Sequence, residues 1–122
     1  MSRSKRSPNH EDKNLLQGTL DLLVLQTLNR SGVMHGYDIA RFIQRISNEV
    51  LRVEEGSLYP ALHRLELDDL IAAEWGHAAS GRRAKFYRLR PAGRKRLEAK
   101  QRRWRELSAA IELILEPSEN AS

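Results

Sequence analysis

The sequence predicts a mainly α-helical fold with one small β-hairpin: a winged helix-turn-helix followed by a long C-terminal dimerisation helix. Apolar residues recur at helical spacing in three segments before residue 70. They then alternate with period two in two short segments around a basic loop, which is the pattern of a hairpin. A last helical segment begins at Pro91. Three helices, a hairpin and a long helix, in that order, give this fold class.

The first two predicted helices are amphipathic. One spans residues 15–28 and is followed by Gly32, a residue that commonly stands just beyond a helix C-terminus. The other spans residues 35–47, with apolar residues on one face and arginine and glutamine on the opposite face. Both are therefore expected to bury one side against a common core.

The third predicted helix follows a short extended piece over residues 50–53. Gly56 and Ser57 open this helix, which runs to about residue 69 and buries a stripe of leucines. Pro60 is then expected in the first turn, where a missing backbone N–H is tolerated.

The hairpin is predicted from two alternating segments, residues 71–75 and 85–89, with a flexible basic loop over residues 76–84. The helix that follows carries apolar residues at heptad spacing, which is typical of helix–helix association. The residues expected to form the dimer contact are Leu97, Trp104, Leu107, Ile111 and Ile114.

The chain of 122 residues has the length of a single folded domain. Its first part, residues 1–14, is polar and basic and is expected to be a flexible tail. Residues 15–90 form the expected winged-helix domain, residues 91–115 the dimerisation helix, and residues 116–122 a disordered tail.

Composition excludes several classes of protein. There is no cysteine, so disulfides and thiol chemistry are excluded, and no apolar run is long enough to cross a membrane. The four histidines lack paired ligand spacing, so neither a metal site nor a cofactor is expected. Ser57, His63 and Asp68 lie around one helix and cannot form a nucleophilic relay. We expect a cytoplasmic bacterial protein that is not an enzyme.

The charge is strongly segregated along the chain. The formal net charge is +5, but residues 82–105 hold twelve basic residues against one acid. Residues 47–74 hold seven acids against two basic residues. A segregated basic surface fits a polyanionic partner such as DNA, and it also fits a solvated helix face.

The third helix and the hairpin are the predicted DNA-reading elements, because the third helix of a winged helix enters the major groove. The helix is expected to turn Leu58, Leu62 and Leu65 inward. It then presents outward the polar residues Ser57, Tyr59, His63 and Arg64, where they can bond phosphates or base edges. The surrounding acids should repel phosphate, so the positive charge must come from the hairpin. Its tip is expected to hold Arg82, Arg83 and Lys85.

These residues resemble the PadR family of bacterial transcriptional regulators over about residues 17–115. The runs that carry the resemblance are QGTLDLL at 17–23, HGYDI at 35–39, GSLYPALHRLE at 56–66 and RRAKFYRLRPAG at 82–93. The resemblance implies a homodimeric repressor that binds an inverted repeat of double-stranded DNA, of the short subfamily with a single C-terminal dimerisation helix. It also implies DNA contacts by His35 and Tyr37, in addition to the four outward residues of the third helix.

Two residues depart from the family pattern. Arg90 stands where relatives often have threonine, so the usual side-chain cap of the last helix is missing. Asp69 stands where glycine often ends the recognition helix, and aspartate can adopt the left-handed conformation, less readily than glycine.

Trp104 has two open interpretations. By resemblance to ligand-responsive members of the family, it is a candidate effector residue, lining a pocket for a planar aromatic compound that releases the DNA. Alternatively it is an anchor of the dimer interface. A different class of function, a peripheral membrane or protein-adaptor module, rests on the cationic, amphipathic helix over residues 94–115. Its basic and apolar halves are mostly consecutive, which argues against the membrane.

Overall fold

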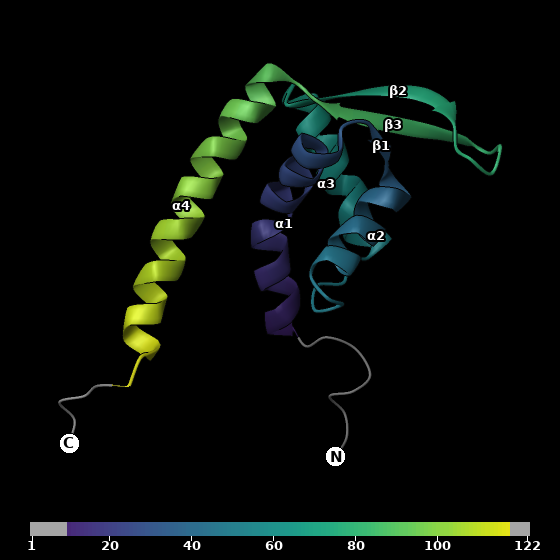
Figure 1. Ribbon diagram of the computed structural model, residues 1–122. Coiled ribbons are helices and arrows are strands. Elements are labelled where there is room, and N and C mark those ends of the chain that lie inside the picture. The colour runs from purple at the N-terminus through teal and green to yellow at the C-terminus, as the bar shows by residue number, and fades with distance from the viewer. Residues whose placement is uncertain (1–9, 118–122) are drawn as a thin grey trace, which may run out of the picture.

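The computed structural model describes residues 10–117, with side chains from residue 19 onward (Figure 1). The elements are α1 (His10–Ser31), β1 (Met34–His35), α2 (Gly36–Ile46), α3 (Glu55–Leu67), β2 (Ile71–His77), β3 (Arg83–Leu89) and α4 (Pro91–Leu115). The predicted fold class is confirmed: helices dominate, and β2 and β3 form a hairpin that extends from the helical body as the wing. Among the described residues, no helix is long and apolar enough to span a membrane.

The sheet has three strands in the order β1-β3-β2, all antiparallel to their neighbours. Its third strand is the two-residue β1, where Met34 pairs with Tyr87. The piece over residues 50–53, predicted to be extended, joins α2 to α3 and is part of neither a helix nor a strand. In that segment the Leu51 backbone N–H donates to the Ser47 hydroxyl at 3.0 Å, which ties the chain back to the end of α2.

The core lies where α1, α2, α3 and the base of the sheet meet. Each element contributes its apolar face, and the side chains are almost fully enclosed. Burial of each large aliphatic side chain contributes roughly 1.5–3 kcal/mol. The largest fully buried side chains are Leu20, Leu25, Leu28, Ile39, Leu58, Leu62, Leu65, Ile71, Leu97 and Val24.

The structure describes only part of the two segments that were predicted to be tails. α1 begins at His10, five residues before its expected start. At the other end, α4 stops at Leu115, as expected. Residues 1–9 and 118–122, on which most of the tail predictions fall, lie outside the described residues.

The third helix starts earlier than predicted, and this changes the position of Pro60. Because α3 begins at Glu55, Pro60 is its sixth residue and lies inside the helix, beyond the first turn. The expectation of a first-turn proline was therefore wrong. Proline has no N–H, so the carbonyl of Gly56, four residues earlier, receives no helical hydrogen bond from it.

Both departures from the family pattern are visible in the backbone. Asp69 has φ of 60°, so it does adopt the left-handed conformation after α3. The N-cap residue of α4, Arg90, makes no side-chain capping hydrogen bond. Pro91 follows as the first helical residue, where it costs no hydrogen bond.

Candidate nucleic-acid interface

The polar face of α3 is turned to solvent as the sequence predicts. Tyr59, His63 and Arg64 are exposed and Ser57 is partly exposed, while the opposite face of the helix is buried. The buried leucines are Leu58, Leu62 and Leu65. The four side chains therefore lie along one accessible strip of the helix. Serine and tyrosine near its N-terminus stand beside backbone N–H groups that favour anions.

The ring of Tyr59 is positioned by α2. It lies against the Cα of Gly36, so closely that a methyl group built there would stand 2.7 Å from Cε1 and 2.9 Å from the hydroxyl oxygen of Tyr59. Burial raises the pKa of Tyr59 above its ordinary value of 10.0, and the negative charge of Glu55 raises it further. The hydroxyl thus keeps its proton at neutral pH and can donate a hydrogen bond to a phosphate or base.

His35 and Tyr37 lie at the start of α2 but differ in accessibility. The imidazole of His35 is only 16% exposed; its Nε2 is 3.2 Å from Asp38, and its ring packs edge-on against Phe86. Tyr37 is 52% exposed and its ring is stacked with that of His35. Tyr37 is therefore open to a ligand, whereas most of the His35 ring is occupied by intramolecular contacts.

Two of the predicted DNA-binding cations are paired with carboxylates of the chain itself. Arg64 of α3 donates to Asp21 of α1 at 2.7 Å. Lys85 of β3 donates to Glu66 of α3 at 3.2 Å. Both pairs are partly exposed, and such pairs are weak, so DNA can compete for either cation.

The wing is longer and its turn tighter than predicted. The strands continue to His77 and Arg83, and the turn closes with the Ala78 N–H donating to the Arg82 carbonyl at 2.8 Å. Arg82 is in the turn and Arg83 opens β3. Lys85 lies further along the strand, opposite Trp75, so its predicted position at the tip was wrong. Among the described side chains, Arg82 and Arg83 take part in no ion pair.

Trp75 was not predicted as a site residue. Its ring is 56% exposed, and the guanidinium carbon of Arg83 lies 4.4 Å from its centre, which is a cation–π contact. The tryptophan was identified from the sequence only as one member of an alternating strand. Arg83 pairs with His77 across the hairpin, and Trp75 lies two residues before His77 on β2. That Trp75 and Arg83 are neighbours therefore becomes apparent only once the strand register is known.

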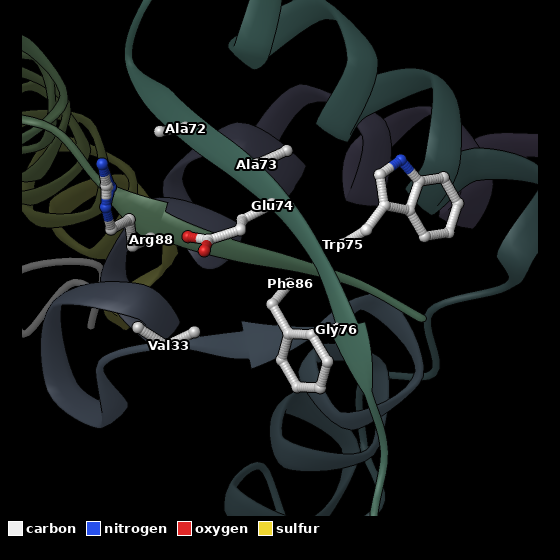
Figure 2. A pocket seen from close by; sticks show the side chains of 8 residues that line it. All are labelled: Val33, Ala72, Ala73, Glu74, Trp75, Gly76, Phe86 and Arg88. Atoms are coloured by element: carbon white, nitrogen blue, oxygen red, sulfur yellow. The ribbon is translucent and has the colours of Figure 1, made fainter. Parts of the chain in front are cut away.

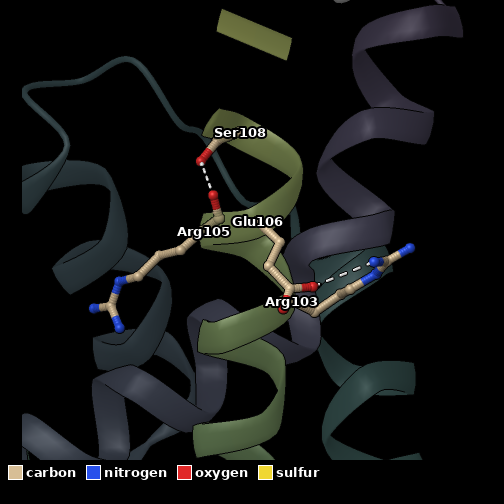
Figure 3. Close-up of polar contacts among 4 residues, drawn as sticks. All are labelled: Arg103, Arg105, Glu106 and Ser108. Carbon is tan, nitrogen blue, oxygen red and sulfur yellow. Dashed lines mark hydrogen bonds and ion pairs between the residues drawn. The ribbon is translucent and has the colours of Figure 1, made fainter. Parts of the chain in front are cut away.

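The basic run of residues 82–105 does not form one surface. The wing and α4 leave the sheet in different directions, so their cations lie on separate parts of the molecule (Figure 1). On α4, Arg94 donates to Asn29 of α1 at 2.6 Å, and Arg103 is 3.4 Å from Glu106. Figure 3 shows Arg103 and Arg105 extending to opposite sides of the helix. This arrangement lacks the one-sided cationic face that a membrane-surface helix needs.

The predicted dimer residues of α4 divide into two groups. Leu97 is 2% exposed and belongs to the core of its own chain, so its assignment to a dimer surface was wrong. The heptad pattern did identify Leu97 as a buried position, but the surface that buries it is the core of the same chain. Further along, the helix is exposed, and its apolar strip consists of Trp104, Leu107, Ile111 and Ile114.

A shallow hollow lies on the outer side of the sheet (Figure 2). Phe86 and Val33 line it together with the side chains of Glu74 and Arg88. The lining does not include Trp104. Among the described residues, no group of acidic or histidine side chains could hold a metal ion.

Comparison with known proteins agrees with this geometry. The model of the "Transcriptional regulator PadR-like family" matches residues 24–99, more than half of the chain. A transcriptional regulator of Mycobacterium tuberculosis is 40% identical over 78 residues, which are 64% of this chain and 69% of that protein. Both the matched family and this mycobacterial relative are transcriptional regulators and not enzymes.

Solved structures show the same fold. A transcriptional regulator from Clostridium thermocellum superposes with a TM-score of 0.76 at 27% identity, covering 84% of this chain and 99% of that one. A PadR family transcription regulator from Clostridium difficile superposes with a TM-score of 0.68 at 30% identity, covering 81% of this chain and 100% of that one. The chain therefore belongs to the PadR-like family of transcriptional regulators.

Proposed function

We propose that this regulator is a repressor that binds an inverted-repeat operator as a homodimer, with α3 in the major groove and the wing against the adjacent backbone. Family membership implies DNA binding. The observation that supports this docking is the exposed polar strip of α3 beside the wing, where Arg82 and Arg83 have no carboxylate partner among the described side chains. Because its target is chromosomal DNA, we also infer a cytoplasmic location.

The exposed apolar strip of α4 supports the homodimer. Trp104 is 44% exposed and Ile111 is 51% exposed, and contact with a second copy would remove this surface from water. A twofold dimer presents two copies of α3, and a pseudo-palindromic operator mirrors that symmetry. A planar aromatic effector near Trp104 would then act by changing the spacing of the two reading helices.

The operator can be found by selection from a random-sequence duplex pool with the full-length protein, followed by footprinting. We expect two half-sites in inverted orientation, about one helical turn apart or a multiple of it. Sedimentation of the complex should give two protein copies per operator. A single asymmetric half-site bound by one copy would contradict the proposal.

The wing contact is tested by its dependence on salt. Changing Arg82→Ala together with Arg83→Ala should weaken binding to all duplexes alike and lower the slope of log K against log salt by about one for each phosphate that the variant no longer binds. Arg102→Ala with Arg103→Ala is the matched control, because it removes the same charge from α4. An equal decrease of slope in both double variants would mean that only net charge matters and that the wing has no special contact.

A further inference from the structure

Trp75 lies on the side of the wing that faces α3. Its direct partner across the hairpin is Lys85, and cross-strand partners share a face. Lys85 reaches Glu66 of α3 from that face, and Tyr87, two residues along, is buried in the core. Figure 2 shows the indole projecting from the opposite side of β2 to Glu74 and Phe86. The indole thus lies beyond the core, in the angle between the wing and the recognition helix.

Arg83 is the cation that this indole holds. It is diagonal to Trp75 on the same face, and its guanidinium carbon is 4.4 Å from the ring centre. A stacked guanidinium keeps its N–H donors free around its edge, where they can bind a phosphate in bidentate fashion. Lys85, on the same face, is engaged by Glu66. Arg83 is therefore the cation on this face whose hydrogen-bonding edge is available.

We propose that Trp75 is a positioning residue for DNA binding, which holds the Arg83 guanidinium ready for the phosphate of a DNA strand that passes between the wing and α3. The inference rests on the wing contact proposed above. An arginine at the end of a hairpin otherwise samples many rotamers, and ordering it on binding weakens affinity. Stacking on the indole restricts those rotamers before DNA arrives, so the contact forms with a smaller entropic loss.

The test is a double-mutant cycle in the full-length protein, measured on a fluorescein-labelled random-sequence duplex. Trp75→Leu should weaken binding about two- to fivefold, which corresponds to the strength of an exposed cation–π contact. Trp75→Phe retains an aromatic face and should recover part of that loss. In the Arg83→Ala background, Trp75→Leu should have no further effect, because the side chain through which it acts is gone.

Two controls separate positioning from folding. Phe42→Leu removes two cation–π contacts, with Arg30 of α1 and with Arg45 of α2, and it should leave binding unchanged. In a Trp104→Phe background, the fluorescence of Trp75 reports the stacking directly, and Arg83→Ala should shift its emission. A hairpin that is merely loosened by Trp75→Leu would weaken binding with or without Arg83.

The results of the cycle distinguish a failure of the positioning role of Trp75 from a failure of the proposed wing contact on which it rests. If Arg83→Ala weakens binding but Trp75→Leu does not, the positioning role is wrong and the wing contact stands. If Trp75→Leu weakens binding equally in both backgrounds, the tryptophan does not act through Arg83 and the inference is wrong. If Arg83→Ala itself leaves binding unchanged, the wing contact is overturned, and the inference falls with it.

Discussion

The contact between Gly36 and Tyr59 makes the substitution Gly36→Ala informative. The new methyl carbon would stand 2.7 Å from Cε1 of Tyr59, about 0.7 Å inside the 3.4 Å at which ordinary contact begins. The ring of Tyr59 is the end of a side chain that is 43% exposed, so it can swing into solvent. Gly36 is the first residue of α2, where only part of the helix-interior preference of about 1 kcal/mol for alanine over glycine applies. Stability should therefore change by no more than about 1 kcal/mol.

DNA binding should respond more strongly than stability. If Tyr59 contacts a base, moving its ring removes a contact worth about 1–3 kcal/mol, or about 5- to 150-fold in affinity. The measurement is fluorescence anisotropy on the selected operator, paired with thermal unfolding by circular dichroism. Gly56→Ala is the matched control, since its new methyl group would meet no atom within 4 Å apart from its chain neighbours and the backbone of its own helix. Its binding should therefore equal that of the wild type.

A second background decides whether the loss passes through Tyr59. In a Tyr59→Ala protein, which has no ring to displace, Gly36→Ala should cost no further affinity. Operator binding by Gly36→Ala at wild-type strength would refute the reasoning, because the observed ring position would then not matter. The same loss in the Tyr59→Ala background would refute it too, since it would implicate the α2 backbone instead.

Three further substitutions test the remaining contacts. Asp21→Asn should release Arg64 and strengthen binding to random-sequence DNA, with a salt slope larger by up to about one; unchanged or weaker binding would contradict this. Trp104→Ala should shift sedimentation toward monomer, whereas a dimer of undiminished strength would favour a ligand role for this residue. The pKa of Tyr87 is raised mainly by burial, and further by Glu66 and Tyr59. Tyr87 therefore keeps its proton in the native state at a pH at which the unfolded chain, where its pKa is near 10.0, releases that proton. Stability should therefore fall as pH rises above 10.0, and Tyr87→Phe should reduce that fall between about pH 9 and pH 11 in urea titrations; an unchanged fall would mean that other groups cause it.

The helices and the hairpin could be predicted because each has its own periodicity. β1 could not, since two residues have no period and Met34 becomes a strand residue only by pairing with Tyr87. The assignment of Leu97 failed for a related reason. A heptad pattern shows that a helix face is buried by another surface, but it does not show whether that surface belongs to the same chain.

The site was predictable in its outline and not in its contacts. The outward strip of α3 follows from helical geometry alone, and it is found where expected. The partners of those residues come from distant parts of the chain: Asp21 reaches Arg64 across 43 positions, and Gly36 reaches Tyr59 from α2. Such pairs arise from the packing of elements against one another, and no local pattern records them.

The ion pairs of Arg64 with Asp21 and of Lys85 with Glu66 affect how well the protein distinguishes its operator from random DNA. Arg64 and Lys85 already have carboxylate partners, so random DNA gains less by attracting them than by attracting an unpaired cation, because each new phosphate contact replaces an existing ion pair. A base that presents two acceptors to Arg64 in the right geometry can offset the loss of Asp21, and a lone phosphate oxygen does so less well. The pairs thus weaken binding to random sites more than binding to the operator. We therefore expect the ratio between the two affinities to depend on Asp21, while the affinity common to all sequences depends on Arg82 and Arg83.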